Sequence, residues 1–257
     1  MVITAGIDAG LQNIKVAILK GKDILSLVNF PACNKSIAVA TLEALKMAAE
    51  QVQLLLDDIE YITATGSGMG DIPFVKNRIS EFICLTKGIN YFFPSVDIVL
   101  DIGVQKTLVV KCKHGMPIKI GYNDRCASGT GRYLEMAANI LGLQLEESGR
   151  LSLQSESPVE VTSNCAVFAE SEIISLVHAG NRPEDILKGV YKSLASSLYP
   201  LLLKTGLEKN SVTALCGGVV KNMGIVEALR EMVGNLYIPD QPEMISAIGA
   251  ALHGLDE

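Results

Sequence analysis

The sequence predicts an α/β fold in which one structural unit occurs twice. A short apolar strand runs into Asp8-Ala-Gly10, and the same pattern returns 93 residues later at Asp101-Ile-Gly103. A second apolar strand and a basic, glycine-containing turn follow each site. Such self-similarity indicates a duplication, with two unrelated strand-to-turn junctions as the alternative. Helical patterns lie between the strands, as in α/β proteins.

The expected elements follow from the spacing of apolar residues. Residues 3–7 and 15–19 form a hairpin around the first Asp-x-Gly site, because apolar runs flank a glycine-containing turn. Apolar side chains recur every three or four positions in residues 37–56, which predicts a helix. We expect further strands at 59–64, 97–103, 107–112 and 212–215, and further helices at 75–85, 130–141, 170–179, 185–205 and 247–253.

Length and composition limit the class of protein. The 257 residues are enough for two domains of about 100–150 residues each, which we place at 1–96 and 97–257. With 49% apolar and 19% charged residues, the chain is not disordered. A net charge of −6 excludes the basic surface that binds a nucleic-acid backbone. No apolar run approaches the roughly 20 residues of a spanning helix, so we expect neither nucleic acid nor a membrane as partner.

Two further features point to the cytoplasm. The N-terminus has no basic region leading into an apolar stretch, as a secretory signal has. The six cysteines show no Cys-x-x-Cys spacing, and a chain of this length does not need disulfides for stability. We therefore expect a cytoplasmic protein in a reducing compartment.

Three glycine-containing loops are candidates for binding phosphate. Asp8 and Asp101 each place a carboxylate at the end of a strand beside a glycine, which lets backbone N–H groups approach an anion closely. Two such loops facing each other would hold a polyphosphate and its Mg²⁺, with the carboxylates acting through metal-bound water. A third loop, Gly217-Gly218, follows a later strand, and Lys15 is either a phosphate ligand or a solvated strand residue. The P-loop pattern is absent.

Two cysteines stand before predicted helices. Cys126 precedes a glycine-rich turn and an amphipathic helix, and Cys165 repeats the arrangement. The dipole and free N–H groups of a helix N-terminus stabilise a thiolate, which leaves a redox dithiol and metal ligation both open. Two thiolates per chain are too few for a site with four cysteine ligands, whereas a homodimer would supply four. The remaining cysteines are expected in the core: Cys33, Cys84, Cys112 and Cys216.

Together these residues form a recognisable set of motifs. The sequence resembles the BadF/BadG/BcrA/BcrD ATPase family over nearly its whole length, and among its members the activators of 2-hydroxyacyl-CoA dehydratases and the ATPase subunits of benzoyl-CoA reductase. The resemblance implies the actin and sugar-kinase (ASKHA) fold, with two duplicated ribonuclease-H-like α/β domains and a nucleotide cleft between them. The motifs are Gly6-Ile-Asp8-x-Gly10, Asp101-Ile-Gly103, Asn123-Asp-x-Cys126-Ala-x-Gly-Thr-Gly-Arg132, Cys165-x-Val-Phe-Ala-Glu-Ser-Glu172, Gly217-Gly-Val219 with Lys221-Asn222, and Ala247-x-Gly-Ala-Ala251.

The resemblance also implies an activity. ATP or ADP would bind with Mg²⁺, and a homodimer would share one 4Fe-4S cluster held by Cys126 and Cys165 of each subunit. ATP hydrolysis would drive one low-potential electron from the cluster into an iron-sulfur partner, namely a 2-hydroxyacyl-CoA dehydratase, a benzoyl-CoA reductase or a related reductase. A donor such as ferredoxin or flavodoxin would reduce the cluster, and the setting would be anaerobic.

Matched position by position, the resemblance assigns roles within the three loops. Asp8 and Asp101 would hold Mg²⁺ and water, and Gln105 would be the third catalytic residue. The expected nucleotide contacts are Gly10, Leu11, Gln12, Asn13 and Lys15 in the first loop, Gly103 in the second, and Gly217, Gly218 and Glu243 around the adenosine.

Five positions depart from the family pattern. Leu11 and Gln12 stand where the first loop usually has Ser and Thr. In the second loop Val104 and Lys106 replace a glycine and an acid, and Glu243 stands where activators often have Gln. These changes put fast ATP hydrolysis in question, whereas the two cysteine motifs show no departure.

Two alternative functions are compatible with the same fold. One is a small-molecule kinase in which Asp101 would be the general base, although a kinase has no use for two helix-capping cysteines. The other is a nucleotide sensor that does not hydrolyse ATP, which the altered phosphate loops favour.

Overall fold

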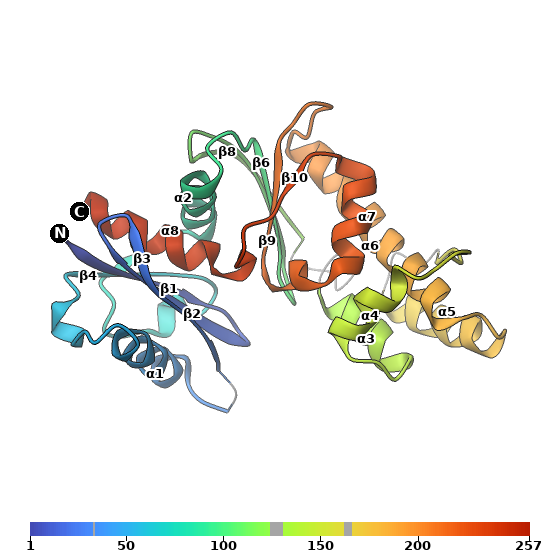
Figure 1. Cartoon of the computed structure of the whole chain (residues 1–257), viewed down its shortest axis with the longest axis horizontal. Coiled ribbons are helices and arrows are strands. Elements are labelled where there is room, and N and C mark those ends of the chain that lie inside the picture. Colours follow the sequence, from blue (N-terminus) through green and yellow to red (C-terminus); the bar gives the residue numbers. More distant parts are fainter. Residues whose placement is uncertain (33, 124–130, 162–165) are drawn as a thin grey trace. The chain divides into compact units, whose positions relative to one another are not determined.

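The computed structural model describes residues 1–32, 34–123, 131–161 and 166–257 (Figure 1). The chain forms two compact units. The first unit comprises residues 1–96, 112–118 and 243–257, and the second comprises residues 97–111 and 119–242. Within the described ranges, no helix is long and apolar enough to cross a membrane.

A five-stranded mixed sheet with the order β3-β2-β1-β4-β5 forms the centre of the first unit. The central strand β1 is antiparallel to β2 and parallel to β4. Nearly all of β1 is buried, because most of its side chains are small or β-branched and both faces of the sheet are covered. The strands are β1 (Ile3–Ala9), β2 (Asn13–Lys20), β3 (Asp23–Pro31), β4 (Tyr61–Thr65) and β5 (Asn77–Arg78).

Three helices pack in the first unit: α1 (Ile37–Glu50), α2 (Glu81–Phe92) and α8 (Ile245–His253). The last of them comes from the end of the chain and lies against β1 and α2 (Figure 1). A Cβ at Gly6 would overlap the Ala247 carbonyl oxygen, and a Cβ at Gly249 would overlap that of Cys84. Glycine is therefore required where the backbone of α8 touches its neighbours.

The second sheet repeats the topology of the first. Its order is β10-β9-β6-β7-β8, and its central strand β6 is antiparallel to β7 and parallel to β9. Each sheet therefore has a central strand followed by an antiparallel partner, with a parallel strand from later in the chain on the other side. The strands are β6 (Ile98–Ile102), β7 (Thr107–Lys113), β8 (Met116–Asn123), β9 (Thr213–Cys216) and β10 (Leu236–Tyr237).

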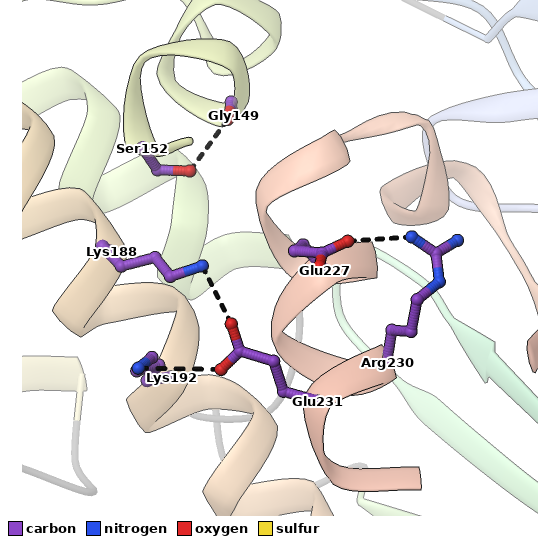
Figure 2. A network of polar contacts seen from close by, with 7 residues as sticks. All are labelled: Gly149, Ser152, Lys188, Lys192, Glu227, Arg230 and Glu231. Carbon is purple, nitrogen blue, oxygen red and sulfur yellow. Dashed lines mark hydrogen bonds and ion pairs between the residues drawn. The ribbon is translucent and has the colours of Figure 1, made fainter. Parts of the chain in front are cut away.

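The described helices of the second unit share one apolar core with its sheet. In Figure 2, Lys188 and Lys192 of α6 reach Glu231 of α7 at 3.2 and 3.6 Å, which ties these two helices together at the surface. The helices are α3 (Gly131–Ile140), α4 (Leu145–Ser152), α5 (Ala166–His178), α6 (Pro183–Thr205) and α7 (Met223–Val233). Short 3₁₀ turns occur at Leu56–Asp58, Met69–Asp71, Gly218–Lys221, Pro242–Met244 and Gly254–Asp256.

The structure confirms the α/β class and corrects several expected elements. The predicted helix at 75–85 is wrong in its first half, because residues 77–78 form β5 and α2 begins only after Ser80. The predicted helix at 37–56 ends at Glu50, after which Gln53 adopts a positive φ of 57°. Six further elements were not expected from the spacing of apolar residues, namely β3, β5, β8, α4, α7 and β10.

Residues 243–257 also differ from their expected place. The sequence division assigned them to a domain that begins at residue 97, whereas α8 packs in the first unit. The physical reason is the run of small residues in α8, which fits closely against β1 and α2.

Candidate functional site

The first carboxylate stands at the end of β1 and is already paired. Asp8 lies opposite Lys15 in the β1–β2 register, and the distance from Lys15 Nζ to Asp8 Oδ2 is 2.9 Å. Both side chains are largely buried, at 10% and 19% exposure. A close, charge-assisted hydrogen bond in such a place fixes the direction of the carboxylate.

The loop after Asp8 forms a tight turn between β1 and β2. Gly10 N donates to Asn13 O at 3.0 Å, and a Cβ at Gly10 would lie 2.7 Å from that same oxygen. The next two residues, Leu11 and Gln12, are exposed at the tip. The Asn13 side chain donates to Asn29 Oδ1 at 2.8 Å, so its amide N–H is engaged within the sheet.

The loop Thr65–Gly70, which was not expected to be part of the site, lies directly against Asp8. β4 is parallel to β1 and pairs Thr65 with Asp8. The next residue, Gly66, has a positive φ of 86°, and a Cβ there would overlap Asp8 Oδ1. The Thr65–Gly70 loop was noted in the sequence only as a strand end, because its place beside Asp8 depends on the parallel pairing.

The second carboxylate has the same surroundings. Asp101, at the end of β6, pairs in parallel register with Cys216 of β9. Gly217 follows with a positive φ of 92°, and a Cβ there would overlap Asp101 Oδ1. Thus each unit holds one strand-end carboxylate against a left-handed glycine from the neighbouring parallel strand.

The turn after Asp101 also matches its counterpart in the first unit. Gly103 N donates to Lys106 O at 2.8 Å, as Gly10 N does to Asn13 O. Gln105 is exposed in this turn. Unlike the first loop, this one contacts a helix, because Gly103 O and Val104 O accept hydrogen bonds from the first residues of α3.

The third loop, Gly217–Lys221, is held in place by buried polar contacts. Gly217 N donates to Pro242 O at 2.9 Å. At the end of the loop, Asn222 accepts from Gly224 N at 2.9 Å and donates to the Tyr191 hydroxyl at 2.8 Å, thereby capping α7 and joining it to α6. Gly218 is exposed, and a Cβ there would meet no atom within 4 Å, which leaves room for a ligand.

Glu243, the last residue of the expected nucleotide set, is placed differently. It is 8% exposed and follows Pro242 in the turn before α8. It belongs to the first unit, whereas Gly217 and Gly218 belong to the second. The expected set of loop residues thus falls into one group on each unit.

The described donors suit a Mg²⁺ ion that is held in part by phosphate. Mg²⁺ keeps several waters and takes one or two carboxylates together with phosphate oxygens. Asp8 and Asp101 each supply one carboxylate with neighbouring backbone groups. Among the described residues no group of three or more His, Cys, Asp or Glu side chains could enclose a metal ion.

Cys126 and Cys165 lie outside the described residues, as does Cys33. The helices that follow the two motif cysteines in the sequence begin at Gly131 and Ala166. Cysteine thiolates are the usual ligands of iron-sulfur clusters, so the residue types fit a cluster ligand.

The described cysteines do not suit ligation. Cys84, Cys112 and Cys216 are buried in the core. Burial raises the pKa of the Cys84 thiol to about 12, despite a hydrogen bond with Thr65 that lowers it, and the Asp8 charge adds to the rise. The Cys112 thiol donates to Val96 O at 3.5 Å. The core assignment of these three cysteines in the sequence analysis is therefore confirmed.

Comparison with known proteins identifies the family. The sequence profile of the BadF/BadG/BcrA/BcrD ATPase family matches residues 5–254. The chain belongs to this family. The match covers both units, including all three loops and both cysteine motifs, so the resemblance drawn from the motifs is confirmed.

Members of the family with known names are similar along their whole length. The activator of lactoyl-CoA dehydratase from Anaerotignum propionicum is 37% identical, covering 98% of this chain and 97% of the relative. Component A of (R)-2-hydroxyglutaryl-CoA dehydratase from Acidaminococcus fermentans superposes with a TM-score of 0.95 at 31% identity. The superposition covers 100% of this chain and 98% of component A. The activator of the 2-hydroxyisocaproyl-CoA dehydratase from Clostridium difficile, with bound ADPNP, superposes with a TM-score of 0.92 at 32% identity. The superposition covers 99% of this chain and 95% of the activator.

A more distant structure gives the fold class. A ROK hexokinase from Thermus thermophilus superposes with a TM-score of 0.53 at 16% identity, covering 99% of each chain. This likeness and the duplicated sheet order show that the chain has the actin and sugar-kinase fold, as the motifs implied.

Proposed function

We propose that this protein is an ATP-hydrolysing activator that delivers single low-potential electrons to an iron-sulfur enzyme. The observation that carries the proposal is the pair of matched carboxylate sites, Asp8 against Gly66 and Asp101 against Gly217. A family member that is 32% identical binds ADPNP and is named as the activator of a dehydratase. Each site, taken by itself, combines a carboxylate with a glycine-containing turn and suits a nucleotide phosphate.

In the first unit, Asp8 and Lys15 have complementary roles. The carboxylate would hold a water of the Mg²⁺ shell. Because Lys15 Nζ lies 2.9 Å from Asp8 Oδ2, the ammonium stands where it can neutralise a phosphate oxygen beside the ion. Backbone N–H groups of the turn at Gly10–Asn13 would complete the phosphate contacts, and the exposed Leu11 offers no hydroxyl to them.

In the second unit, the polar groups suit the water-activating side of the reaction. Asp101 is half-buried and directed by Gly217, while Gln105 is exposed in the adjoining turn. We assign Asp101 and Gln105 to orienting the attacking water, and Gly103 to a phosphate contact. The open surface at Gly218 suits the adenosine. Glu243, on the first unit, stays a predicted nucleotide contact.

The cluster site would be made by two copies of the chain. A 4Fe-4S cluster supplies one-electron transfer at low potential when four thiolates hold it. Cys126 and Cys165 from each of two copies make that number. Val167 and Phe168 lie in the first turn of α5, two and three residues after Cys165 in the sequence. Their side chains are 71% and 69% exposed. Apolar side chains exposed at such a place favour contact with a second copy.

The partner is inferred from the named relatives. We propose an iron-sulfur dehydratase or reductase that acts on a CoA thioester, with a ferredoxin or flavodoxin as electron donor. Both redox partners and the oxygen-sensitive cluster point to an anaerobic cytoplasm.

Anaerobic reconstitution with iron and sulfide tests the cluster. We expect a brown protein with about four irons per dimer. Cys126→Ala and Cys165→Ala should each lose the iron, whereas Cys112→Ala, which removes a buried thiol from β7, should keep it. An iron-free wild-type protein after reconstitution would contradict the electron-transfer function.

ATP turnover tests the nucleotide part separately. Asp8→Asn and Asp101→Asn should abolish turnover while the iron content stays unchanged. Asp57→Asn, an exposed carboxylate near β4, is the matched control and should behave as wild type. Tight ATP or ADP binding without turnover, even with a reduced cluster and partner present, would instead identify a nucleotide sensor. Phosphate transfer to a small hydroxyl compound would identify a kinase.

A further inference from the structure

The second loop is bonded directly to the start of α3. Gly131 N donates to Gly103 O and Arg132 N donates to Val104 O, both at 2.9 Å. The first N–H groups of a helix have no acceptor within the helix, so the carbonyl oxygens of the loop take that role here. A displacement of Gly103 and Val104 would therefore pull on the first turn of α3.

Gly131 is also enclosed by a second nucleotide loop. A Cβ at this position would lie 2.6 Å from Val219 Cγ2 and 3.2 Å from Val104 Cα. The lack of space at this position requires glycine. The start of α3 thus rests on the loops that follow β6 and β9 at the same time.

The opposite face of α3 is fixed in the core. Tyr133 and Ala137 are almost fully buried, in the same apolar cluster as Ala169 and Ile173 of α5. Because packed cores deform little, a shift at Gly131 is expected to be taken up by the first turn of α3, while the rest of the helix stays in place. In the sequence, the helix starts of α3 and α5 follow the segments that contain Cys126 and Cys165.

We propose that Gly131 is the positioning residue that couples the nucleotide loops to the cysteine segment ahead of α3. The inference rests on the proposed function and adds to it the place where the state of the nucleotide is passed on. Loss of the γ-phosphate would move Gly103 and Val104. The two hydrogen bonds and the close contact with Val219 would then carry this movement into α3.

Amide hydrogen exchange of the wild-type protein is the first test, and it needs no cluster. Exchange of the peptide that contains Gly131 and Arg132 is measured with ADPNP and with ADP. We expect the rates to differ by about fivefold or more, the lower range for coupled sites. Equal exchange rates with ADPNP and with ADP would overturn the coupling role of Gly131. If the protein still binds iron and hydrolyses ATP in that case, the proposed function remains intact.

Gly131→Ala tests the contact itself. The added methyl group should push against Val219, leave nucleotide affinity near the wild-type value, and remove the difference in exchange between ADPNP and ADP. In the reconstituted dimer, the rate at which a chelator removes iron should also lose its dependence on the nucleotide. Gly131→Ala with both differences unchanged would overturn the proposal.

A second substitution separates coupling from a general packing defect. Val219→Ala removes the Cγ2 atom that a Cβ at Gly131 would meet at 2.6 Å, so the double variant should regain most of the nucleotide dependence. Gly142→Ala, in the loop after α3, where a Cβ meets nothing within 4 Å, is the matched control and should keep the nucleotide dependence of the wild type. If the Gly131→Ala/Val219→Ala double variant behaves like Gly131→Ala alone, the contact between positions 131 and 219 does not transmit the nucleotide state to α3. If the wild-type protein binds no nucleotide, the proposed function fails and this inference fails with it.

Discussion

Lys15 Nζ lies 2.9 Å from Asp8 Oδ2, across the antiparallel pair β1–β2. The pairing is a direct result of register, because Asp8 and Lys15 are opposite residues. The sequence left open whether Lys15 binds phosphate or is solvated. Its 19% exposure shows that the side chain is not a solvated strand residue. It stands beside the carboxylate that we assign to the Mg²⁺ ion.

Replacing Lys15 should therefore weaken nucleotide binding. Charge-assisted hydrogen bonds contribute about 1.5–3 kcal/mol, so Lys15→Met should weaken ADP binding about 10- to 100-fold. Calorimetric titration with ADP and Mg²⁺ measures the change. Lys87→Met, which removes a surface pair with Asp256, is the control and should bind as wild type. Unchanged affinity of Lys15→Met would reduce Lys15 to a structural partner of Asp8.

The two left-handed glycines beside the carboxylates give a second prediction. Gly66→Ala and Gly217→Ala should each lose most ATP turnover, because the methyl group would displace Asp8 or Asp101 as well as strain the backbone. The backbone strain alone costs about 1–3 kcal/mol. Gly180→Ala is a matched control, with a positive φ of 79° and no atom within 4 Å of the added Cβ. It should lose a similar amount of stability and keep its turnover, and equal turnover in all three variants would contradict the role of the glycines.

Close packing of α8 gives a third prediction, on stability. Gly249→Ala would drive a methyl group into the Cys84 carbonyl oxygen of α2, where only backbone can yield. Overpacking of this kind costs about 1–3 kcal/mol or more, which urea unfolding would measure. Gly70→Ala, with open space at the Cβ, should unfold as wild type. A Gly249→Ala protein as stable as wild type would show that α8 is more loosely held than its contacts indicate.

The strand-end carboxylates could be predicted from the sequence because a short, local pattern marks them. Asp8 and Asp101 each follow an apolar strand and precede a glycine, and the repeat of the pattern gave the duplicated unit. The glycines that direct them could not be assigned in the same way. Gly66 and Gly217 reach Asp8 and Asp101 only through parallel pairing of strands far apart in the chain. Such pairing leaves no local signal.

The missed and misplaced elements have related causes. α4 is short and carries Glu146, Glu147 and Arg150, so its apolar spacing is weak. β3 and β8 are edge strands with many exposed residues, and exposure removes the apolar run that marks a buried strand. α8 was recognised as a helix, but its return to the first unit depends on contacts of Gly249 and Ala247 that no spacing rule contains. The position of α8 in the fold depends on packing between segments far apart in the chain, which the local spacing of apolar residues does not contain.

The polar contacts between α6 and α7 give a prediction on pH (Figure 2). Burial tends to raise the pKa of Glu231, but its hydrogen bond to Lys188 and the charges of Lys188 and Lys192 outweigh this and lower it below 4.5. A lowered pKa in the folded state contributes stability that is complete above the unfolded value. That stability is lost as the pH falls through the folded value. Glu231→Gln should thus reduce stability near neutral pH and have less effect below pH 4.5.

The size of this effect is limited because Glu231 is 45% exposed. Solvent screening reduces such a pair to about 0–1 kcal/mol, and added salt should reduce it further. Urea unfolding of Glu231→Gln and wild type at several pH values measures the difference. Glu227→Gln is the matched control, because Glu227 pairs with Arg230 of its own helix and does not reach α6. A Glu231→Gln deficit that stays constant as the pH falls would assign the contact to packing of the side chain, since a charge effect must vanish once the carboxylate is protonated.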